Sequence, residues 1–302
     1  MNKGLADIKS RYEVGSVGKA LSILSLFTQE RPALNVTDVS RLLDVPKSTA
    51  HNLLRTLQRF NFVSQDSVSK HYRLGRKLYE LGTLYSRGND LLTHALPHLL
   101  GLREKTQETV KLGVLTNTEV LVVRALESPL MLHTRGDEGR LAPLYCTGIG
   151  KALLALLSNE EVRDVLAKVG LRARTPRTVT ALSRLEEEVE EVRRQGFSVD
   201  LEENEEGVHC IGAPVGEVSG ERVAISVSGP ASRFSRNRIP ELAPLVVETA
   251  GVIAVSLGKT ASTVMKSNVE PRLAPAKAGR EERDGVKLAH PNAPSSALRE
   301  LS

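Results

Sequence analysis

Cysteine, aromatic residues and long apolar runs are all scarce in this chain of 302 residues. Its two cysteines, Cys146 and Cys210, are too few for a disulfide framework and form no Cys-x-x-Cys pair, so we expect a reducing, cytoplasmic environment. The absence of tryptophan, with only five tyrosines and five phenylalanines, argues against a protein that stacks single-stranded bases on aromatic side chains. Residues 1–20 lack the apolar core of a signal peptide, and no apolar run approaches the roughly 18 residues of a membrane-spanning helix.

The charge of the chain is unevenly distributed along its length. The net charge is +5, but residues 1–80 hold 13 Lys and Arg against 7 Asp and Glu. Residues 81–260 hold 21 basic and 24 acidic side chains. The basic excess therefore belongs to the N-terminal segment and indicates a polyanionic partner there. The length predicts two domains, since a typical domain has about 100–200 residues.

The N-terminal part is predicted to form a winged helix-turn-helix. Apolar residues at helical spacing predict a first helix over 16–30, with Ser16 as its N-cap. Thr37 is the expected cap of a short second helix, and a third begins near Pro46, whose missing N–H is harmless in a first turn. Two β-prone pieces joined by the polar turn Asp66–Ser69 complete the pattern as a hairpin.

The polar face of the third helix has the residue types that read DNA. Opposite its apolar stripe stand arginine, which pairs with guanine, asparagine, which pairs with adenine, and Lys, Ser and Thr, which bind phosphates. A solvated helix face is the alternative, but the preceding short helix and the basic hairpin favour DNA recognition. The predicted DNA-binding residues are Lys47, Ser48, Thr49, His51, Asn52 and Arg55 on the helix and Lys70, His71 and Arg73 on the hairpin.

Three further regions follow the predicted DNA-binding domain, which we assign to residues 1–75. Residues 76–88 continue the helical spacing as a linker helix, and residues 89–260 alternate irregularly between strands and helices, which is typical of a mixed α+β sensor domain. Residues 261–302 hold four prolines and little apolar periodicity, so we expect a disordered tail. In the sensor domain we expect strands over 110–115, 119–126, 197–201, 210–215 and 223–229, and helices over 91–106, 150–157, 160–169, 181–195 and 239–258.

Two motifs of the sensor domain are candidates for ligand binding. The turn Thr147–Lys151 lacks the first glycine and the final Ser or Thr of a phosphate-binding loop, so it is not predicted to be one. The weaker prediction is that free N–H groups of the turn hold an anionic or carbonyl group. The strand around residues 223–229 places Ser226 and Ser228 on one face, where a polar ligand would partner their hydroxyls. A ligand-free turn and serines that face water are the alternatives.

No catalytic set stands out in the sequence. It has neither Gly-x-Ser-x-Gly nor His-Glu-x-x-His, and His133, Cys146, His209 and Cys210 lack the spacing of a zinc motif, so we expect no metal or cofactor. One rival hypothesis is an enzyme with a DNA-binding tether, for which Cys210 beside His209 is the only nucleophile and base. Consecutive strand residues point to opposite faces, so this pair is badly arranged for that chemistry. The other rival is an architectural DNA binder without sequence preference.

Seven motifs, taken in order, identify a family. The segments SVGKALSILSLF, DVPKSTAHNLLRTL, YRLGRKLYELG, LYCTGIGKALLALL, TPRTVT, GFSVDLEENEEGVHCIGAPV and VAISVSGPASR resemble the IclR family of bacterial transcriptional regulators over residues 14–258. The resemblance implies a winged helix-turn-helix joined to a GAF-like α/β effector-binding domain, assembled as homodimers or homotetramers on palindromic operators. It also implies an effector cavity lined by Gly148, Ile149, Gly150, Asp200, Val208, Cys210, Ser226 and Ser228.

The resulting hypothesis is a cytoplasmic, ligand-responsive transcription factor. A small polar metabolite would bind the second domain and change the affinity for DNA by favouring one arrangement of the oligomer. The chain departs from the family at Asn52, where many members have arginine, and at Gly212 and Gly216, where larger residues are common. The sequence leaves open the operator, the choice between repression and activation, and the charge of the effector, since Asp200 would repel a carboxylate unless one of the two is protonated.

Overall fold

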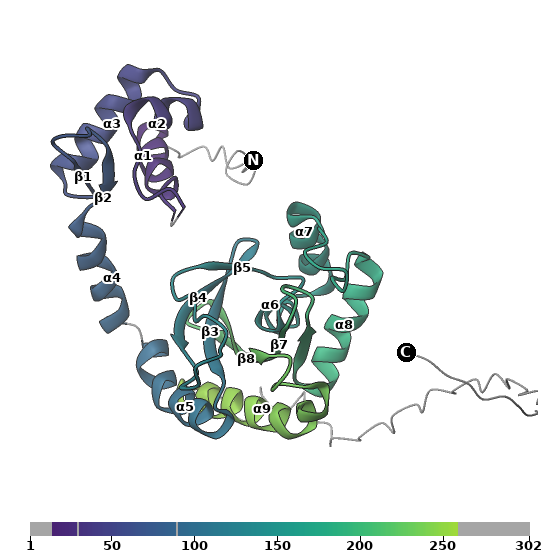
Figure 1. Ribbon diagram of the computed structural model, residues 1–302. Coiled ribbons are helices and arrows are strands. Elements are labelled where there is room, and N and C mark those ends of the chain that lie inside the picture. The colour runs from purple at the N-terminus through teal and green to yellow at the C-terminus, as the bar shows by residue number, and fades with distance from the viewer. Residues whose placement is uncertain (1–13, 29, 89, 259–302) are drawn as a thin grey trace, which may run out of the picture. The chain divides into compact units, whose positions relative to one another are not determined.

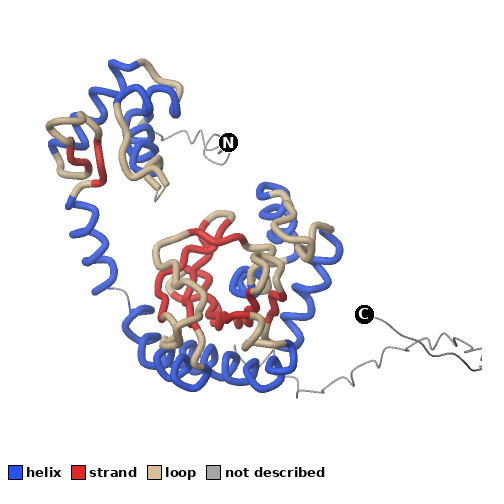
Figure 2. The backbone as a smooth tube through the Cα atoms, viewed as in Figure 1, coloured by secondary structure: helices blue, strands red, loops and turns tan. Residues whose placement is uncertain are grey.

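The structure is a computed structural model that describes residues 14–28, 30–88 and 90–258 (Figure 1). The tail predicted over 261–302 lies outside the described residues. Strands occur in two places, a short hairpin that follows the first helices and a larger sheet in the second half of the chain (Figure 2).

Three helices and a hairpin form the first folded part, as the sequence predicts. Helices α1 (Gly15–Ser25), α2 (Val36–Leu43) and α3 (Lys47–Arg59) precede strands β1 (Val63–Gln65) and β2 (Tyr72–Leu74), which pair antiparallel. One apolar core joins these elements, made of Ile23, Leu34, Val39, Val45, Ala50, Leu54, Leu57, Val63 and Tyr72. The apolar stripe of α3 is therefore what fixes the helix in the domain and decides which of its faces stays exposed.

Both helix caps predicted for the first two helices are wrong. Ser16 lies inside α1, which has no side-chain cap and ends well before residue 30. Helix α2 is capped by Asn35 instead of Thr37, because Asn35 accepts a hydrogen bond from the Asp38 N–H at 2.9 Å and the Asp38 carboxylate accepts one from the Asn35 N–H at 3.1 Å. This reciprocal capping box satisfies two backbone donors at once, which a hydroxyl two residues later does not achieve.

Helices α4 to α9 follow the hairpin. The predicted linker helix is found as α4, and the helix after it continues through Pro97. The bounds are α4 Arg76–Gly88, α5 Asp90–Thr106, α6 Gly148–Leu154, α7 Asn159–Val169, α8 Leu182–Gln195 and α9 Ile239–Ser256, with a short 3-10 turn at Arg236–Arg238. Helix α6 starts two residues before its predicted position, so that the whole Gly-Ile-Gly turn belongs to its first turn.

A six-stranded antiparallel sheet organises the second half of the chain. Its spatial order is β5-β4-β3-β8-β7-β6. The strand bounds are β3 Thr109–Thr116, β4 Glu119–Leu126, β5 Leu141–Pro143, β6 Ser198–Leu201, β7 Val208–Val218 and β8 Glu221–Pro230. Strand β5 was not predicted, because its three residues are too few to show the alternation by which a strand is recognised in a sequence.

The two faces of this sheet are covered by different helices. Alternate residues of β3, β7 and β8, among them Leu112, Ile211 and Ile225, share one apolar core with side chains of α5 and α9. On the other face Ala224 packs with side chains of α6, including Ala152 and Leu153. In Figure 1, α5 and α9 run side by side along one face, whereas α6 lies against the other. Along β8, Ser226 and Ser228 alternate with the core residues and therefore share the α6 face with Ala224.

The segment Arg236–Ser256 corrects the expectation that no apolar run is long enough to cross a membrane. By length and composition this single stretch of the described residues would suffice. In the structure it contains α9, and Leu242, Ala243, Val246, Ala250, Ile253 and Ala254 of that helix are buried in the core of the sheet. These six side chains thus pack on the β-strands, whereas Val252 and Val255 of the same helix are exposed.

Candidate DNA interface and effector site

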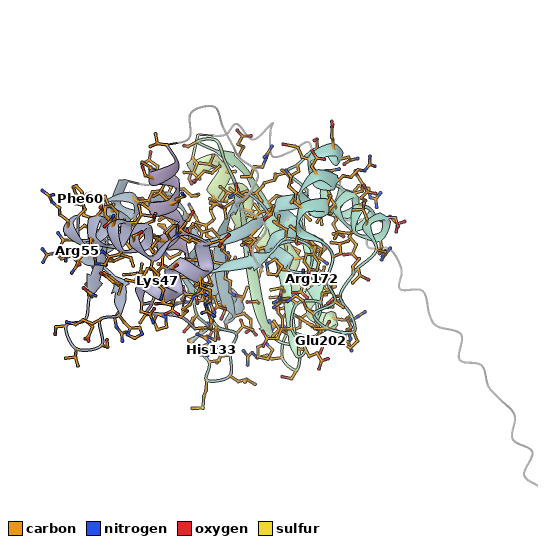
Figure 3. All side chains as sticks on the ribbon, turned by 90° about the horizontal axis from the view of Figure 1, so that it is seen from above. Lys47, Arg55, Phe60, His133, Arg172 and Glu202 are labelled. Atoms are coloured by element: carbon orange, nitrogen blue, oxygen red, sulfur yellow. The ribbon has the colours of Figure 1, made fainter. Side chains whose placement is uncertain are left out.

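The exposed face of α3 carries the predicted base-reading and phosphate-binding side chains. Ala50, Leu54 and Leu57 are buried on the inner face of the helix. Lys47 and Arg55 are labelled on this helix in Figure 3. The outer face presents Lys47, Ser48, His51, Asn52 and Arg55 as exposed residues, and Thr49 is half-buried. The groups that hydrogen-bond to bases and phosphates are therefore available on one helix face.

A tight turn between α2 and α3 sets the direction of the candidate recognition helix. Asp44 ends α2 in the left-handed conformation with a φ of 51°, and the Ser40 hydroxyl donates a hydrogen bond to the Val45 carbonyl at 2.6 Å. Val45 is buried in the domain core, so the chain reverses there and α3 starts immediately afterwards. This is the helix–turn–helix arrangement that places the second helix in a major groove.

The hairpin ends in a compact loop that carries the other predicted DNA-binding residues. The Asp66 carboxylate accepts hydrogen bonds from the Ser69 N–H at 2.7 Å and the Val68 N–H at 3.1 Å, and these bonds lower the pKa of Asp66. Lys70 and Arg73 are exposed, whereas His71 is half-buried with Nδ1 3.0 Å from the Ser69 carbonyl. The loop is therefore ordered by Asp66 and leaves two cationic side chains free to meet a phosphate backbone.

In the second half of the chain, strand register gathers the predicted effector residues on the α6 face of the sheet. One row across the sheet pairs Asp200 with Cys210, Cys210 with Ser228, and Ser228 with Thr109. Directly paired residues project to the same face. The next row contains Ser198, Gly212, Ser226 and Lys111. Two rows of polar and small side chains thus lie side by side beneath the first turn of α6.

The glycines of this region allow α6 to lie directly on β7. A Cβ on Gly212 would be 2.3 Å from the Gly148 carbonyl oxygen, and one on Gly148 would be 3.0 Å from the Cys210 Cβ. The Ser198 hydroxyl donates a hydrogen bond to the Gly148 carbonyl and ties the two elements together. Larger residues are common in the family at the position of Gly212, and here a larger side chain would prevent the close contact between β7 and α6.

One prediction for the Gly-Ile-Gly turn is wrong in part. The N–H of Gly150 is not free, because it donates to the Thr147 hydroxyl at 3.0 Å in a helix N-cap. A Cβ on Gly150 would also lie 2.4 Å from the Leu144 carbonyl oxygen. Gly150 therefore has a structural role in this turn, and only Gly148 and Ile149 remain as its candidates for ligand contact.

The Cys210 thiol lies where the candidate groups converge. Burial and, to a smaller extent, the Asp200 carboxylate raise its pKa to about 12. The Lys111 ammonium, the Ser228 hydroxyl and the Gly148 N–H act in the opposite direction. A thiol with such a pKa is neutral and weakly nucleophilic at physiological pH, which suits a binding surface and not catalysis.

The two serines of β8 differ in their partners. Ser228 is 2% exposed, and its hydroxyl lies 2.9 Å from the Thr134 hydroxyl in the β4–β5 loop (residues 127–140). Ser226 is 1% exposed, and within the part of the chain that the structure describes its hydroxyl has no hydrogen-bond partner. A buried hydroxyl without a partner costs about 1–3 kcal/mol, so this oxygen marks a position where a ligand would be stabilised.

A buried ion cluster that was not predicted from the sequence lies beside the effector face. The ammonium of Lys151, 2% exposed, lies 2.6 Å from a Glu203 carboxylate oxygen and 2.9 Å from one of Glu188. Burial alone would lower the pKa of Lys151, but the two carboxylates outweigh it and raise the pKa. A lysine inside the otherwise apolar segment GIGKALLALL was the available signal, since a lysine is rarely fully buried without a partner.

The same cluster holds Asp200 in place. The Glu203 N–H donates to the Asp200 carboxyl at 2.8 Å, and the hydroxyls of Thr175 and Thr178 donate to the carbonyls of Glu202 and Glu203 at 2.6 Å. Burial raises the pKa of Asp200 to about 7, despite that N–H, and the Glu203 carboxylate adds to the rise. Asp200 is thus close to its titration midpoint at physiological pH.

The remaining residues singled out from the sequence lie apart from the effector face or at its margin. Val208 is half-buried at the start of β7 on the same face as Cys210. His209 points to the opposite face, where Nδ1 lies 2.7 Å from the Phe234 carbonyl and burial lowers the pKa of its ring. Cys146 is buried, with its thiol 3.7 Å from the Asn204 side-chain oxygen. In the described ranges no three His, Cys, Asp or Glu side chains gather as a metal site.

Comparison with protein families accounts for this combination of parts. The model of the bacterial transcriptional regulator IclR C-terminal domain matches residues 83–255, and that of the IclR helix-turn-helix domain matches residues 16–67. The chain belongs to the IclR family. This IclR-family chain is therefore a DNA-binding transcriptional regulator with a C-terminal effector-binding domain, and it is not an enzyme.

Individual IclR-family members are similar over most of their length. The HTH-type transcriptional regulator KdgR of Escherichia coli is 35% identical over 246 residues, covering 81% of this chain and 93% of KdgR. The HTH-type transcriptional repressor AllR of Salmonella typhimurium is 33% identical over 256 residues, covering 84% and 94%. A crystal structure of an IclR homologue from Microbacterium hydrocarbonoxydans with 4-hydroxybenzoate has a TM-score of 0.68 and 25% identity, covering 80% of this chain and 98% of that one.

Proposed function

We propose that this regulator binds a palindromic operator as a homodimer or homotetramer in the cytoplasm and responds to a small polar metabolite. The exposed face of α3 would read bases, with Arg55 and Asn52 as the pairing residues. Lys47, Ser48, Lys70 and Arg73 would contact phosphates. The name of its relative AllR supports repression as the mode of action.

The metabolite site is the α6 face of the sheet around Cys210. The observation that carries this proposal is the buried hydroxyl of Ser226, which has no partner among the described residues and lies in one row with Ser198 and Lys111, next to the row of Asp200 and Ser228. A ligand there would accept or donate hydrogen bonds that the protein leaves unmade. The crystal structure of the Microbacterium homologue contains 4-hydroxybenzoate, which supports an effector of similar size for this regulator.

Entry of the metabolite requires a local movement of the β4–β5 loop. Thr134 in this loop is bonded both to the Ser228 hydroxyl and, through its carbonyl, to the Thr109 hydroxyl at 2.8 Å. A ligand that takes over the Ser228 hydroxyl would remove one of the hydrogen bonds that hold Thr134, whose hydroxyl also donates to the Ser228 carbonyl at 3.1 Å. Effector binding would then favour a different loop position, and coupling to DNA requires that the two positions differ in ligand affinity.

Two measurements test the proposal. Selection from a pool of random duplexes should return one palindromic sequence, with affinity that falls as salt rises. Equal binding to all duplexes would contradict operator recognition.

For the effector site, a thermal-shift screen of small metabolites, with 4-hydroxybenzoate included, should identify a compound that raises the melting temperature. The double variant Ser226→Ala and Ser228→Ala should lose that shift, whereas Ser183→Ala, on the exposed surface of α8, should keep it. A shift that persists in the double variant would place the site elsewhere.

A further inference from the structure

Lys111 is a half-buried cation on the effector face. It lies in the middle of β3, between Val110 and Leu112, which are both fully buried in the α5–α9 core. Alternation along the strand therefore directs Lys111 to the α6 face. Strand register places it directly opposite Ser226, whose hydroxyl lacks a partner among the described residues.

The ammonium of Lys111 has no counter-ion in the part of the chain that the structure describes. No salt bridge or side-chain hydrogen bond involves it, although Lys151 on the same side of the sheet is neutralised by two carboxylates. Lys111 and Cys210 lie in neighbouring rows of this face, on the two strands that flank β8, and the ammonium lowers the pKa of the Cys210 thiol. A partly desolvated cation beside an unpartnered buried hydroxyl is the arrangement expected where an anion binds.

Asp200, an acidic residue in the next row of the face, forms no salt bridge with Lys111 among the described residues. The Asp200 carboxyl lies in the next row of the sheet and is bonded to the Glu203 N–H at 2.8 Å. Burial raises the pKa of Asp200 to about 7, so at neutral pH a large fraction is protonated and able to donate a hydrogen bond. The face thus combines a cation, a hydroxyl and a carboxylic acid that need not repel an anion.

We propose that Lys111 is the residue that makes this effector site specific for a small carboxylate. This inference rests on the proposed location of the effector site. The ligand carboxylate would bind the Lys111 ammonium and accept a hydrogen bond from Ser226. A hydroxyl or carbonyl group elsewhere on the ligand would meet Asp200 or Ser228.

The test compares carboxylates with their uncharged counterparts. Two suitable pairs, which differ chiefly in charge, are lactate with lactamide and 4-hydroxybenzoate with 4-hydroxybenzamide. Further hydroxy, oxo and aromatic acids would be measured in the same way beside their amides. Binding to the full-length protein would be followed by thermal shift and by calorimetric titration. The variants are Lys111→Met, which keeps the length of the stem, Lys111→Arg, which keeps the charge, and Lys168→Met on the exposed surface of α7, which controls for net charge.

We expect at least one acid to bind while its amide does not. Lys111→Met should weaken the binding of that acid about tenfold to a hundredfold, since a charge-assisted hydrogen bond is lost. Lys111→Arg should retain part of the affinity, and Lys168→Met all of it. Circular dichroism and the melting temperature of the unliganded variants show whether Lys111→Met is folded, and Lys111→Gln replaces it if it is not.

Three results would overturn the inference. They are amides that bind as well as their acids, an acid whose affinity is the same for wild type and Lys111→Met, and a panel in which no carboxylate binds. If an uncharged or cationic metabolite binds and Ser226→Ala abolishes its binding, the effector site stands and only the role of Lys111 is refuted. If no compound of any charge class binds, the proposed effector site falls as well.

Discussion

Asp200→Asn is expected to stabilise the protein at neutral and alkaline pH. Asp200 is 2% exposed, and burial raises its pKa from 3.8 to about 7. The folded protein therefore keeps this proton over a pH range in which the unfolded chain has released it. A raised carboxyl pKa favours the folded state at low pH, and this contribution is lost progressively as the pH rises from the unfolded-state value of 3.8 to the folded-state value of about 7.

The size of the effect follows from the two pKa values. The interval between 3.8 and about 7 corresponds to about 4 kcal/mol, at about 1.4 kcal/mol per pKa unit. Asparagine does not ionise, and its amide oxygen still accepts the hydrogen bond from the Glu203 N–H. Relative to wild type, the free energy of unfolding of Asp200→Asn should rise by about 4 kcal/mol from about pH 4 to about pH 8.

The assay is urea unfolding of both proteins at a series of pH values and at one fixed protein concentration, since oligomers gain stability with concentration. Asp164→Asn, on the exposed surface of α7, controls for the loss of one acidic side chain. A difference between wild type and Asp200→Asn that stays level across this pH range would refute the reasoning. A difference that falls with pH would mean that the fold lowers the pKa of Asp200.

Three further substitutions test the other parts of the molecule. Lys151→Met should lower the free energy of unfolding by about 3–5 kcal/mol, because it leaves buried carboxylates unpaired. Adding Glu203→Gln should recover part of this loss. If urea unfolding shows instead that the two losses add, the ion cluster is contradicted. Arg55→Ala should weaken operator binding in a fluorescence-anisotropy titration by about 1–3 kcal/mol and reduce base preference, whereas an equal loss on all duplexes would indicate a phosphate contact. Gly212→Ala should destabilise the protein by about 1–3 kcal/mol in a thermal melt, since its Cβ would lie 2.3 Å from a carbonyl oxygen. The control Gly101→Ala, whose Cβ would have no atom within 4 Å, should be neutral or stabilising in the same melt.

Patterns that repeat within one helix or strand were predicted well. The apolar stripe of α3 was visible because helical spacing places Ala50, Leu54 and Leu57 on one face, and the structure buries these three residues. The alternation along β8 likewise placed Ser226 and Ser228 on one face, and both are buried there. Such patterns need only the geometry of a single element.

Predictions that depended on a choice between neighbouring groups were less successful. Asn35 and Thr37 are both suitable caps, and only the reciprocal bond with Asp38 decides between them. The N–H of Gly150 was expected to be free, but the hydroxyl of Thr147 lies close enough to accept its hydrogen bond. In both places several polar groups compete for the same backbone donors, and residue types alone do not rank them.

The sequence by itself determined the order of the elements, the exposed polar face of α3 and the resemblance of seven successive motifs to one family, because each depends on residues close together in the chain. Only the tertiary structure decided which distant residues share the effector face. Lys111, Asp200 and Ser226 come from three strands, and antiparallel register brings them into neighbouring rows. The pairing of Lys151 with Glu203 and the missing partner of Ser226 have the same origin, because burial and hydrogen bonding arise only when separate elements pack together.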